Sequence, residues 1–220
     1  MSDVYPIFIA IAVVAGGALA ATLAAFPLSK TISGVRGLKL ASGASHIKSD
    51  ALLLSQIAID ARSSKTVAFE DASNEVTDPF LREALLLAAS RLDAETLRNL
   101  LVFILQEKKE QFEEAERFWS FTASTFSAWG MIGALLGLML TASGSRFADS
   151  GLVIGVTSAA LGILISQCLA LPIAVRMNSR SKKALHRMRM IIEGLTSIKA
   201  GDVPHITETK LKIFSGLDGD

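Results

Sequence analysis

The sequence is poor in the residue types that build disulfides, metal clusters and nucleic-acid surfaces. Its 220 residues include a single cysteine, Cys168, which rules out an intramolecular disulfide, and its three histidines are too scattered for metal-ligand spacing. A net charge of +1 without a basic stripe argues against a nucleic-acid partner. No nucleophile–base pair and no phosphate-binding loop is visible either. We therefore predict that the chain is not an enzyme and needs no cofactor and no metal.

Charged side chains are almost absent between Arg117 and Arg176, where only Arg146 and Asp149 occur. A further uncharged run lies near the N-terminus, and each run is longer than the roughly 20 residues that cross a bilayer core. Hydrophobic residues make up 50% of the chain, which is typical of an integral membrane protein. We predict three transmembrane helices and one short extracytoplasmic loop. In chain order these are helix 4–29, helix 118–145, loop 146–150 and helix 151–175.

The first apolar run lacks the features of a cleaved signal peptide. Asp3 is the only charge before Lys30, so a basic n-region is missing, and the apolar stretch exceeds a usual h-region. The residues around Pro27 also form a poor cleavage site. We expect this run to be a retained membrane helix.

Lysine and arginine residues predict the topology. They cluster directly after the first span and directly after the third, whereas the N-terminus and the hairpin loop together contribute only Arg146. By the positive-inside rule, the segment 30–117 and the tail 176–220 are cytoplasmic. The N-terminus and the loop 146–150 then lie on the extracytoplasmic side.

The segment 30–117 contains clear helix starts. Asp78-Pro79 is typical of one, because aspartate caps a helix and proline suits its first turn, and we expect this helix to reach about Ser90. A second helix is predicted to begin near Asp93 and to run directly into the second span.

The tail is predicted to be helical to about Ala200, where Gly201-Asp202-Val203-Pro204 breaks the helix. The sequence contains no strand signal of any length. The predicted fold class is therefore all-α, an integral membrane protein with three transmembrane helices and a helical cytoplasmic domain.

Two segments of the sequence resemble a known family. Residues 190–206 read Met-Ile-Ile-Glu-Gly-Leu-Thr-Ser-Ile-Lys-Ala-Gly-Asp-Val-Pro-His-Ile, and residues 128–138 read Ala-Trp-Gly-Met-Ile-Gly-Ala-Leu-Leu-Gly-Leu. Both resemble the flagellar stator A-subunit family (MotA and PomA) of the MotA/TolQ/ExbB proton channel superfamily. The run from Val14 to Pro27 is similar to that family's second span. Nothing in the sequence is similar to the family's first span, so we expect a divergent member that lacks it.

The resemblance implies a stator-type ion-channel subunit in the bacterial inner membrane. Such a subunit assembles as a ring, a pentamer, around a pair of B-subunits and converts proton flow into mechanical work such as flagellar rotation. An ExbB/TolQ-like energiser and a non-conducting membrane scaffold derived from such a subunit remain as alternatives.

The spans contain no ionisable residue in their interior, although a proton path through hydrocarbon normally needs an ionisable relay. The resemblance implies that a MotB-like B-subunit supplies it as a transmembrane aspartate. It also implies contact with a FliG-like rotor protein on the cytoplasmic side, through Arg62 and Glu70, which match the family's charged pair by spacing. The alternative for both side chains is an ordinary solvated charge.

Hydroxyl groups in the third span are candidates for lining an ion path. Thr157 and Ser158 lie mid-span, although each hydroxyl could instead bond to the carbonyl four residues earlier. Alignment on Gly162 sets Ser158 and Ala159 opposite the family's threonine pair, so the second threonine is an alanine here. Ala134 replaces a threonine of sodium-type members, which favours protons. We expect these four residues at positions 134 and 157–159 to line the ion path.

Glycines recur at helical spacing in both hairpin helices: Gly130, Gly133, Gly137, Gly155 and Gly162. Small residues on one face let membrane helices approach closely. The sequence does not distinguish packing inside one subunit from packing against a partner's helix in a ring.

Proline is expected to bend the third span at Pro172, because it removes a backbone hydrogen bond. In the resembled family this proline, and another at the start of the preceding span, couple ion passage to movement. The second position is Ser127 here, which weakens the expectation of intact coupling.

Overall fold

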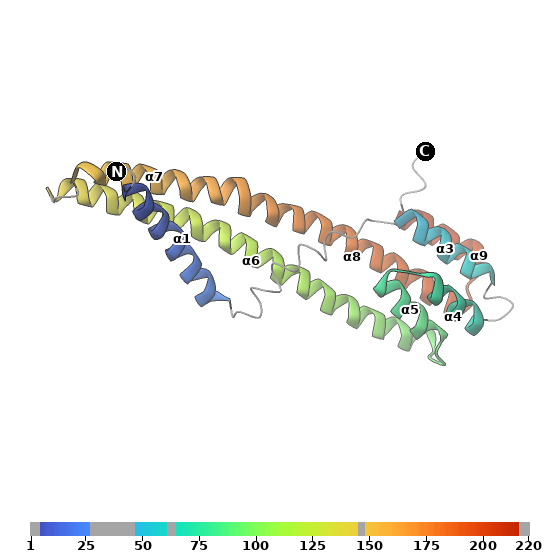
Figure 1. Cartoon of the computed structure of the whole chain (residues 1–220). Helices are drawn as coiled ribbons and strands as arrows, with labels where there is room; N and C mark the ends of the chain where they lie inside the picture. Colours follow the sequence, from blue (N-terminus) through green and yellow to red (C-terminus); the bar gives the residue numbers. More distant parts are fainter. Residues whose placement is uncertain (1–4, 27–46, 61–64, 145–147, 216–220) are drawn as a thin grey trace. The chain divides into compact units, whose positions relative to one another are not determined.

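The structure is a computed structural model of the chain and describes residues 5–26, 47–60, 65–144 and 148–215. Within these ranges all regular structure is helical and no strand occurs, so the all-α prediction is confirmed (Figure 1). The elements in chain order are α1 (Tyr5–Ala25), α3 (Ile47–Asp60), α4 (Lys65–Glu75), α5 (Pro79–Ala89), α6 (Ala94–Ala142), α7 (Ala148–Leu164), the π-helix η2 (Ile165–Ala170), α8 (Leu171–Ala200) and α9 (Pro204–Ser215).

Three helical stretches are long and apolar enough to cross a membrane. They are Tyr5–Ala25, Ala94–Ala142 and Ser150–Ala200, in agreement with the three predicted spans. The helix α6 is continuous for 49 residues and passes without a break through residue 117, where we placed the membrane boundary. Helix ends therefore do not mark the bilayer surface, and the boundaries of the predicted spans, loop and cytoplasmic segments remain predictions.

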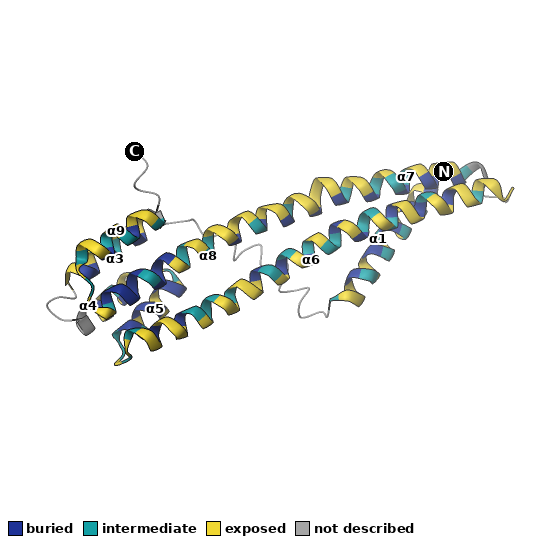
Figure 2. Cartoon of the chain, turned by 180° about the vertical axis from the view of Figure 1, so that it is seen from behind, coloured by how far each residue is buried: buried dark blue, intermediate teal, exposed yellow. Residues whose placement is uncertain are grey.

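The chain folds into two compact units. The first unit comprises Met1–Ala41 and Gln111–Ser179, and the second comprises Ser42–Glu110 and Arg180–Asp220. In the first unit many apolar side chains of α6 and α7 are exposed, whereas buried residues gather on α5 and on the end of α8 in the second (Figure 2). A bilayer would cover the exposed apolar surface of the first unit.

The second unit has a conventional apolar core. This core is formed by α3, α4, α5 and α9 together with the beginning of α6 and the end of α8. Its almost completely buried side chains are Leu54, Phe69, Leu81, Leu85, Leu97, Leu101, Met190, Ile191, Leu195 and Leu211. Gly194 lets α8 approach its neighbours, since a Cβ there would lie 3.0 Å from Leu211 Cδ2 and 3.1 Å from Leu54 Cδ1.

Caps define both ends of α5 and the start of α6. The Asp78 carboxylate accepts a hydrogen bond of 3.0 Å from the Leu81 N–H, and Pro79 occupies the first turn, which confirms the predicted helix start. At the other end of α5, the Lys199 amine donates to the carbonyls of Ala88 and Ser90, both at 2.7 Å. Asp93 accepts from the Thr96 N–H at 3.1 Å where α6 begins, as predicted.

The predicted break after Ala200 is confirmed as a glycine-terminated helix end. Gly201 has a φ of 86°, and its N–H donates to the Ile198 carbonyl while the Asp202 N–H donates to the Ser197 carbonyl, each at 3.1 Å. Pro204 then starts α9, a helix that the sequence analysis did not anticipate.

Candidate functional site

The helices α6 and α7 of the first unit form a hairpin in which their backbones touch through glycine. A Cβ on Gly137 would lie 2.4 Å from the Gly155 nitrogen and 2.5 Å from the Gly151 carbonyl oxygen. A Cβ on Gly162 would lie 2.6 Å from the Gly130 Cα. No side chain fits at these contacts. We call this line of contact the glycine seam, and all five glycines predicted to pack helices lie in it, within a single chain.

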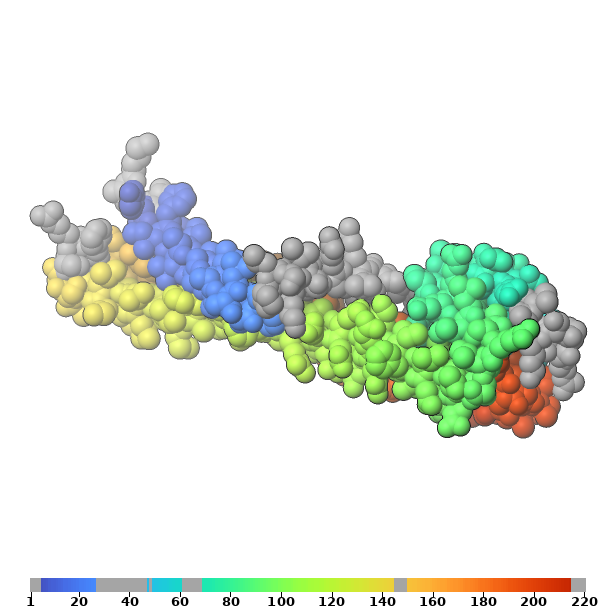
Figure 3. Space-filling view, turned by 90° about the horizontal axis from the view of Figure 1, so that it is seen from below, coloured from blue at the N-terminus to red at the C-terminus, as the bar shows by residue number. Residues whose placement is uncertain are grey.

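Helix α1, blue in Figure 3, packs against the hairpin beside the glycine seam. A Cβ on Gly17 would overlap the Trp129 ring at 2.2 Å, and one on Gly133 would lie 3.7 Å from Val13. Near the end of α1, Phe26 makes edge-to-face contacts with Phe118 and Phe121, both with ring centroids 5.5 Å apart.

Ser158 lies inside the glycine seam. It is completely buried, its hydroxyl has no hydrogen-bond partner, and its Oγ lies 2.7 Å from where a Cβ of Gly133 would be. Thr157 differs, because its hydroxyl donates to the carbonyl of Val153 one turn earlier. This is the local hydrogen bond that the sequence left open as the alternative to an ion-lining role. The two adjacent hydroxyls therefore have different surroundings, and they do not line one common surface.

The structure divides the four candidates for the ion path by flank. Successive helical residues are about 100° apart, so Thr157 and Ala159 lie on opposite flanks of Ser158. The flank of Thr157 also carries Ile154, which lines a cavity with residues of α1. Ala159 therefore lies on the flank remote from α1.

On α6, Ala134 also lies on the side away from α1. It is half-buried, and its carbonyl oxygen lies 3.1 Å from where a Cβ of Gly155 would be. Trp129, one turn before Gly133, contacts Gly17 of α1 and so marks the side of α6 that faces α1. Ala134 lies about 100° from Gly133 in the direction away from Trp129. Ser127 lies two turns earlier on the same face as Ala134 and is also half-buried. We call the surface of Ser127, Ala134 and Ala159 the small-residue flank.

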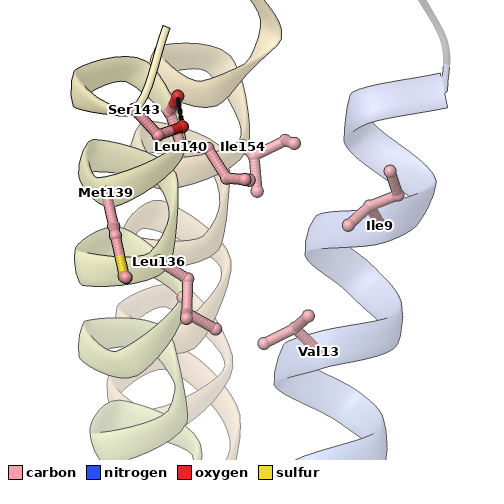
Figure 4. A pocket seen from close by; sticks show the side chains of 8 residues that line it. Ile9, Val13, Leu136, Met139, Leu140, Ser143 and Ile154 are labelled. Carbon is pink, nitrogen blue, oxygen red and sulfur yellow. Dashed lines mark hydrogen bonds between the residues drawn. The ribbon is translucent and has the colours of Figure 1, made fainter. Parts of the chain in front are cut away.

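The cavity between α1 and the hairpin is apolar. It has a volume of about 250 Å³, and in Figure 4 Ile9 and Val13 extend from α1 towards Leu136 and Ile154 across it. Its one hydroxyl group, on Ser143, donates to the carbonyl of Leu140 at 2.9 Å. Such a lining offers no side-chain ligand for an ion.

Of the remaining predicted site residues, Pro172 belongs to the first unit and Glu70 to the second. Pro172 is exposed at the start of α8 and follows the π-helix η2, in which the Leu171 N–H donates to the carbonyl of Ser166. Glu70 is exposed on α4 in the second unit. Arg62, its expected companion, lies outside the described residues.

Sequence reasoning missed an ionic cluster in the second unit. The Arg187 guanidinium donates to the carboxylates of Asp50 and, at 2.5 Å, of Asp78, and only 15% of its side chain is exposed. Burial raises the pKa of Asp78, but the hydrogen bonds from the Leu81 N–H and Arg187, together with the charge of Arg187, outweigh it and hold the pKa below its usual value. Local patterns could not reveal this cluster, because the partners are more than 100 residues apart in sequence.

Comparison with known proteins gives a consistent picture. The family described as the MotA/TolQ/ExbB proton channel family matches residues 72–190, which is more than half of the chain. The YtxD protein of Bacillus subtilis (strain 168) is 26% identical over 211 residues, covering 94% of this chain and 78% of that protein. Motility protein A of Treponema phagedenis is 25% identical over 204 residues, covering 90% and 79%.

Solved structures share the fold. The structure of C. jejuni MotAB matches with a TM-score of 0.83 at 20% identity, covering 93% of this chain and 82% of the matched one. The flagellar MotAB stator complex from Bacillus subtilis matches with a TM-score of 0.79 at 23% identity, covering 91% and 81%. At these identities the likeness concerns the fold.

Proposed function

Because the chain belongs to the MotA/TolQ/ExbB proton channel family, we propose that it is a stator-type subunit that uses proton flow to do mechanical work, with flagellar rotation as the driven process. The family is one of proton channels and not a class of enzymes, and we assign the chain no catalytic role. Several relatives carry the name Motility protein A, which supports flagellar motility as the process.

The observation that carries this proposal is the small-residue flank. It lies on the membrane hairpin away from α1, its side chains are half-buried and small, and no acidic or basic residue lies near it in the spans. A helix can approach such a surface closely. A proton relay there needs a carboxylate from outside the chain.

We assign that carboxylate to a MotB-like B-subunit with a transmembrane aspartate. Two matched structures are described as MotAB complexes, which supports a partner of this kind. Copies of this chain, five in our proposal, surround a pair of such partners and turn the small-residue flank inwards. The alanines at 134 and 159 leave no threonine hydroxyl to coordinate sodium there, which favours protons as the conducted ion.

The proposed orientation follows the basic residues. The N-terminus and the loop 146–150 face the extracytoplasmic side of the bacterial inner membrane, and the second unit and the C-terminus face the cytoplasm. There a FliG-like rotor protein contacts the second unit through Glu70 and Arg62. Charge complementarity suits a contact that forms and releases repeatedly.

Co-purification tests the proposal directly. The full chain is expressed with the single-span protein encoded beside it, extracted in mild detergent, and the complex is measured by native mass spectrometry. We expect a ring of several copies with two partner chains, and a partner variant with asparagine in place of its membrane aspartate should still assemble but lose proton flux. A chain that stays monomeric, or a complex whose proton flux ignores that aspartate, would contradict the proposal.

The alanine at 159 favours a second candidate, a scaffold that assembles without conducting. Ala159→Thr restores the hydroxyl of the resembled family, and Ala160→Thr is its matched control because Ala160 points outward on the adjacent position of α7. A conducting stator should gain or change proton flux with the first substitution and not with the second. A scaffold should respond to neither.

A further inference from the structure

The π-helix η2 interrupts the third span at a point that the proposed function does not use. The Leu171 N–H donates to the carbonyl of Ser166, five residues back instead of four. Pro172 follows and has no N–H to donate. Counting four or five residues back from Pro172, at least one carbonyl of Gln167 and Cys168 therefore has no helical donor.

The same turn carries the most polar side chain of the two uncharged segments 118–145 and 151–175. Outside the loop 146–150, Gln167 is the only side chain in residues 118–175 that is more polar than a hydroxyl or a thiol. Both Gln167 and Cys168 are exposed in the structure, whereas Ser166 and Ala170 are buried on the opposite side of the turn. The exposed Gln167 amide thus belongs to the same turn as the carbonyl that Pro172 leaves without a donor.

Hydrocarbon does not tolerate this arrangement. A backbone carbonyl left without a donor in the bilayer core costs several kcal/mol, and a glutamine amide adds to that cost. Gln167 precedes Arg176, the first charge after the span, by nine residues, or about 13 Å along a helix. Water from the Arg176 end can reach that depth if it finds polar groups to bind.

We propose that η2 is a water-binding site, in which the unpaired carbonyl and the Gln167 amide hold water that enters from the Arg176 end of the span. The site deepens the proposed function, on which its role rests, by giving a proton a polar place to leave the membrane. Binding of water itself depends only on the groups of this turn. It requires neither the partner chain nor conduction.

The single cysteine of the chain provides the test. Cys168 lies next to Gln167, and a thiol reacts as its thiolate, which forms only where water reaches it. The full chain is labelled in inverted and in right-side-out membrane vesicles with a charged, water-soluble methanethiosulfonate. We expect labelling of Cys168 in inverted vesicles only, at least 10-fold faster than at a matched control cysteine.

The control is Leu164→Cys in a Cys168→Ser background. Leu164 is exposed to 56% on the turn before η2 but lies in ordinary α-helix, so its side chain is exposed without an unpaired carbonyl beside it. Equal rates at the two positions, or a slow Cys168 covered by lipid or by a neighbouring helix, would overturn the proposal.

Two variants test the cause. Pro172→Ala supplies the missing N–H, and Gln167→Leu removes the amide, so each should slow labelling of Cys168 several-fold. Circular dichroism confirms that the variants are folded, and if Pro172→Ala is not, Gln167→Leu decides alone. An unchanged rate of Cys168 labelling in a folded variant would refute the assignment. A hydrated Cys168 in a chain that captures no partner would leave this site standing while the proposed function fails.

Discussion

Single glycines decide how closely α6 and α7 can approach. At Gly137 an added methyl group would lie 2.4 Å from backbone that cannot turn aside, whereas at Gly16 on α1 it would meet nothing within 4 Å. Both glycines lie in helices that are long and apolar enough to cross a membrane, but only Gly137 is in the glycine seam. Position in the seam, and not glycine itself, sets the cost of substitution.

Gly137→Ala should therefore destabilise the first unit by about 1–3 kcal/mol, because the helices must separate. Gly16→Ala is the matched control and should be neutral or stabilising by up to about 1 kcal/mol, since alanine favours helix. Thermal unfolding in detergent, followed by the fluorescence of Trp119 and Trp129, reports on this unit because both tryptophans belong to it. Equal melting temperatures for the two variants would contradict the close contact.

Ser158→Ala should be neutral or stabilising by roughly 1 kcal/mol, because it removes a buried hydroxyl that has no partner. Proton flux through the assembled complex should not change, since this hydroxyl lies in the glycine seam and not on the small-residue flank. Flux and melting temperature are measured on the same preparation. A loss of flux with unchanged stability would return Ser158 to the ion path.

The sequence predicts which glycines share a helix face, but it predicts neither what that face packs against nor which side chains lie beside it. Glycines three and four residues apart share a helix face whatever surrounds them, so spacing alone predicts a close-packing face. It does not say whether that face packs within one chain, and the contacts of Gly137 with Gly155 and of Gly162 with Gly130 answer that question. Thr157, Ser158 and Ala159 share one depth in the span, and spacing says nothing of which flank α1 covers. That information comes from contacts such as Trp129 on Gly17, which join distant parts of the chain.

At the scale of the elements, the helix end at Asp78 links a local cap to the ionic cluster of the second unit. Asp78 caps the start of α5 and also forms an ion pair with Arg187 of α8. Because its folded pKa is lowered, the folded state binds fewer protons than the unfolded state near pH 4. The stabilising contribution is complete above the unfolded pKa of about 3.9 and is lost as the pH falls through the folded value.

Asp78→Asn keeps a capping side chain but removes the charge, so it should lower stability at pH 6 by roughly 1 kcal/mol, a few degrees in melting temperature. Below about pH 4 the difference from the unmodified chain should shrink. Asp71→Asn on the exposed face of α4 is the control for charge alone. Circular dichroism melts between pH 6 and 3 measure both. Parallel curves for the chain and Asp78→Asn would contradict the lowered pKa.

Local chemistry explains which elements were predictable. Asp78, Asp93 and Gly201 act on backbone groups within a few residues, so their helix ends could be read directly. Pro172 predicted a disturbance in the third span, but the widening of the preceding turn into η2 depends on how the chain relieves the proline ring. Helix α9 is short, and its stability comes from burying Leu211 against distant helices.

At the scale of the whole molecule, the distribution of charge predicts the orientation in the membrane. Three apolar helices of spanning length, with basic clusters after the first and the third, predict one orientation in the membrane. A fluorescent protein fused to the C-terminus should fluoresce, and alkaline phosphatase inserted in the loop 146–150 should be active, because each folds only on its own side. The reversed pattern of activity would contradict the proposed orientation.

The glycine seam also bears on how the chain is made. An isolated α7 in lipid would present a groove of bare backbone at Gly151, Gly155 and Gly162 that acyl chains fill poorly, whereas α6 fills it closely. Only residues 143–147 separate the two helices. We therefore expect the pair to leave the insertion machinery together as one folded hairpin, so that commitment to the membrane comes only when synthesis has passed α7.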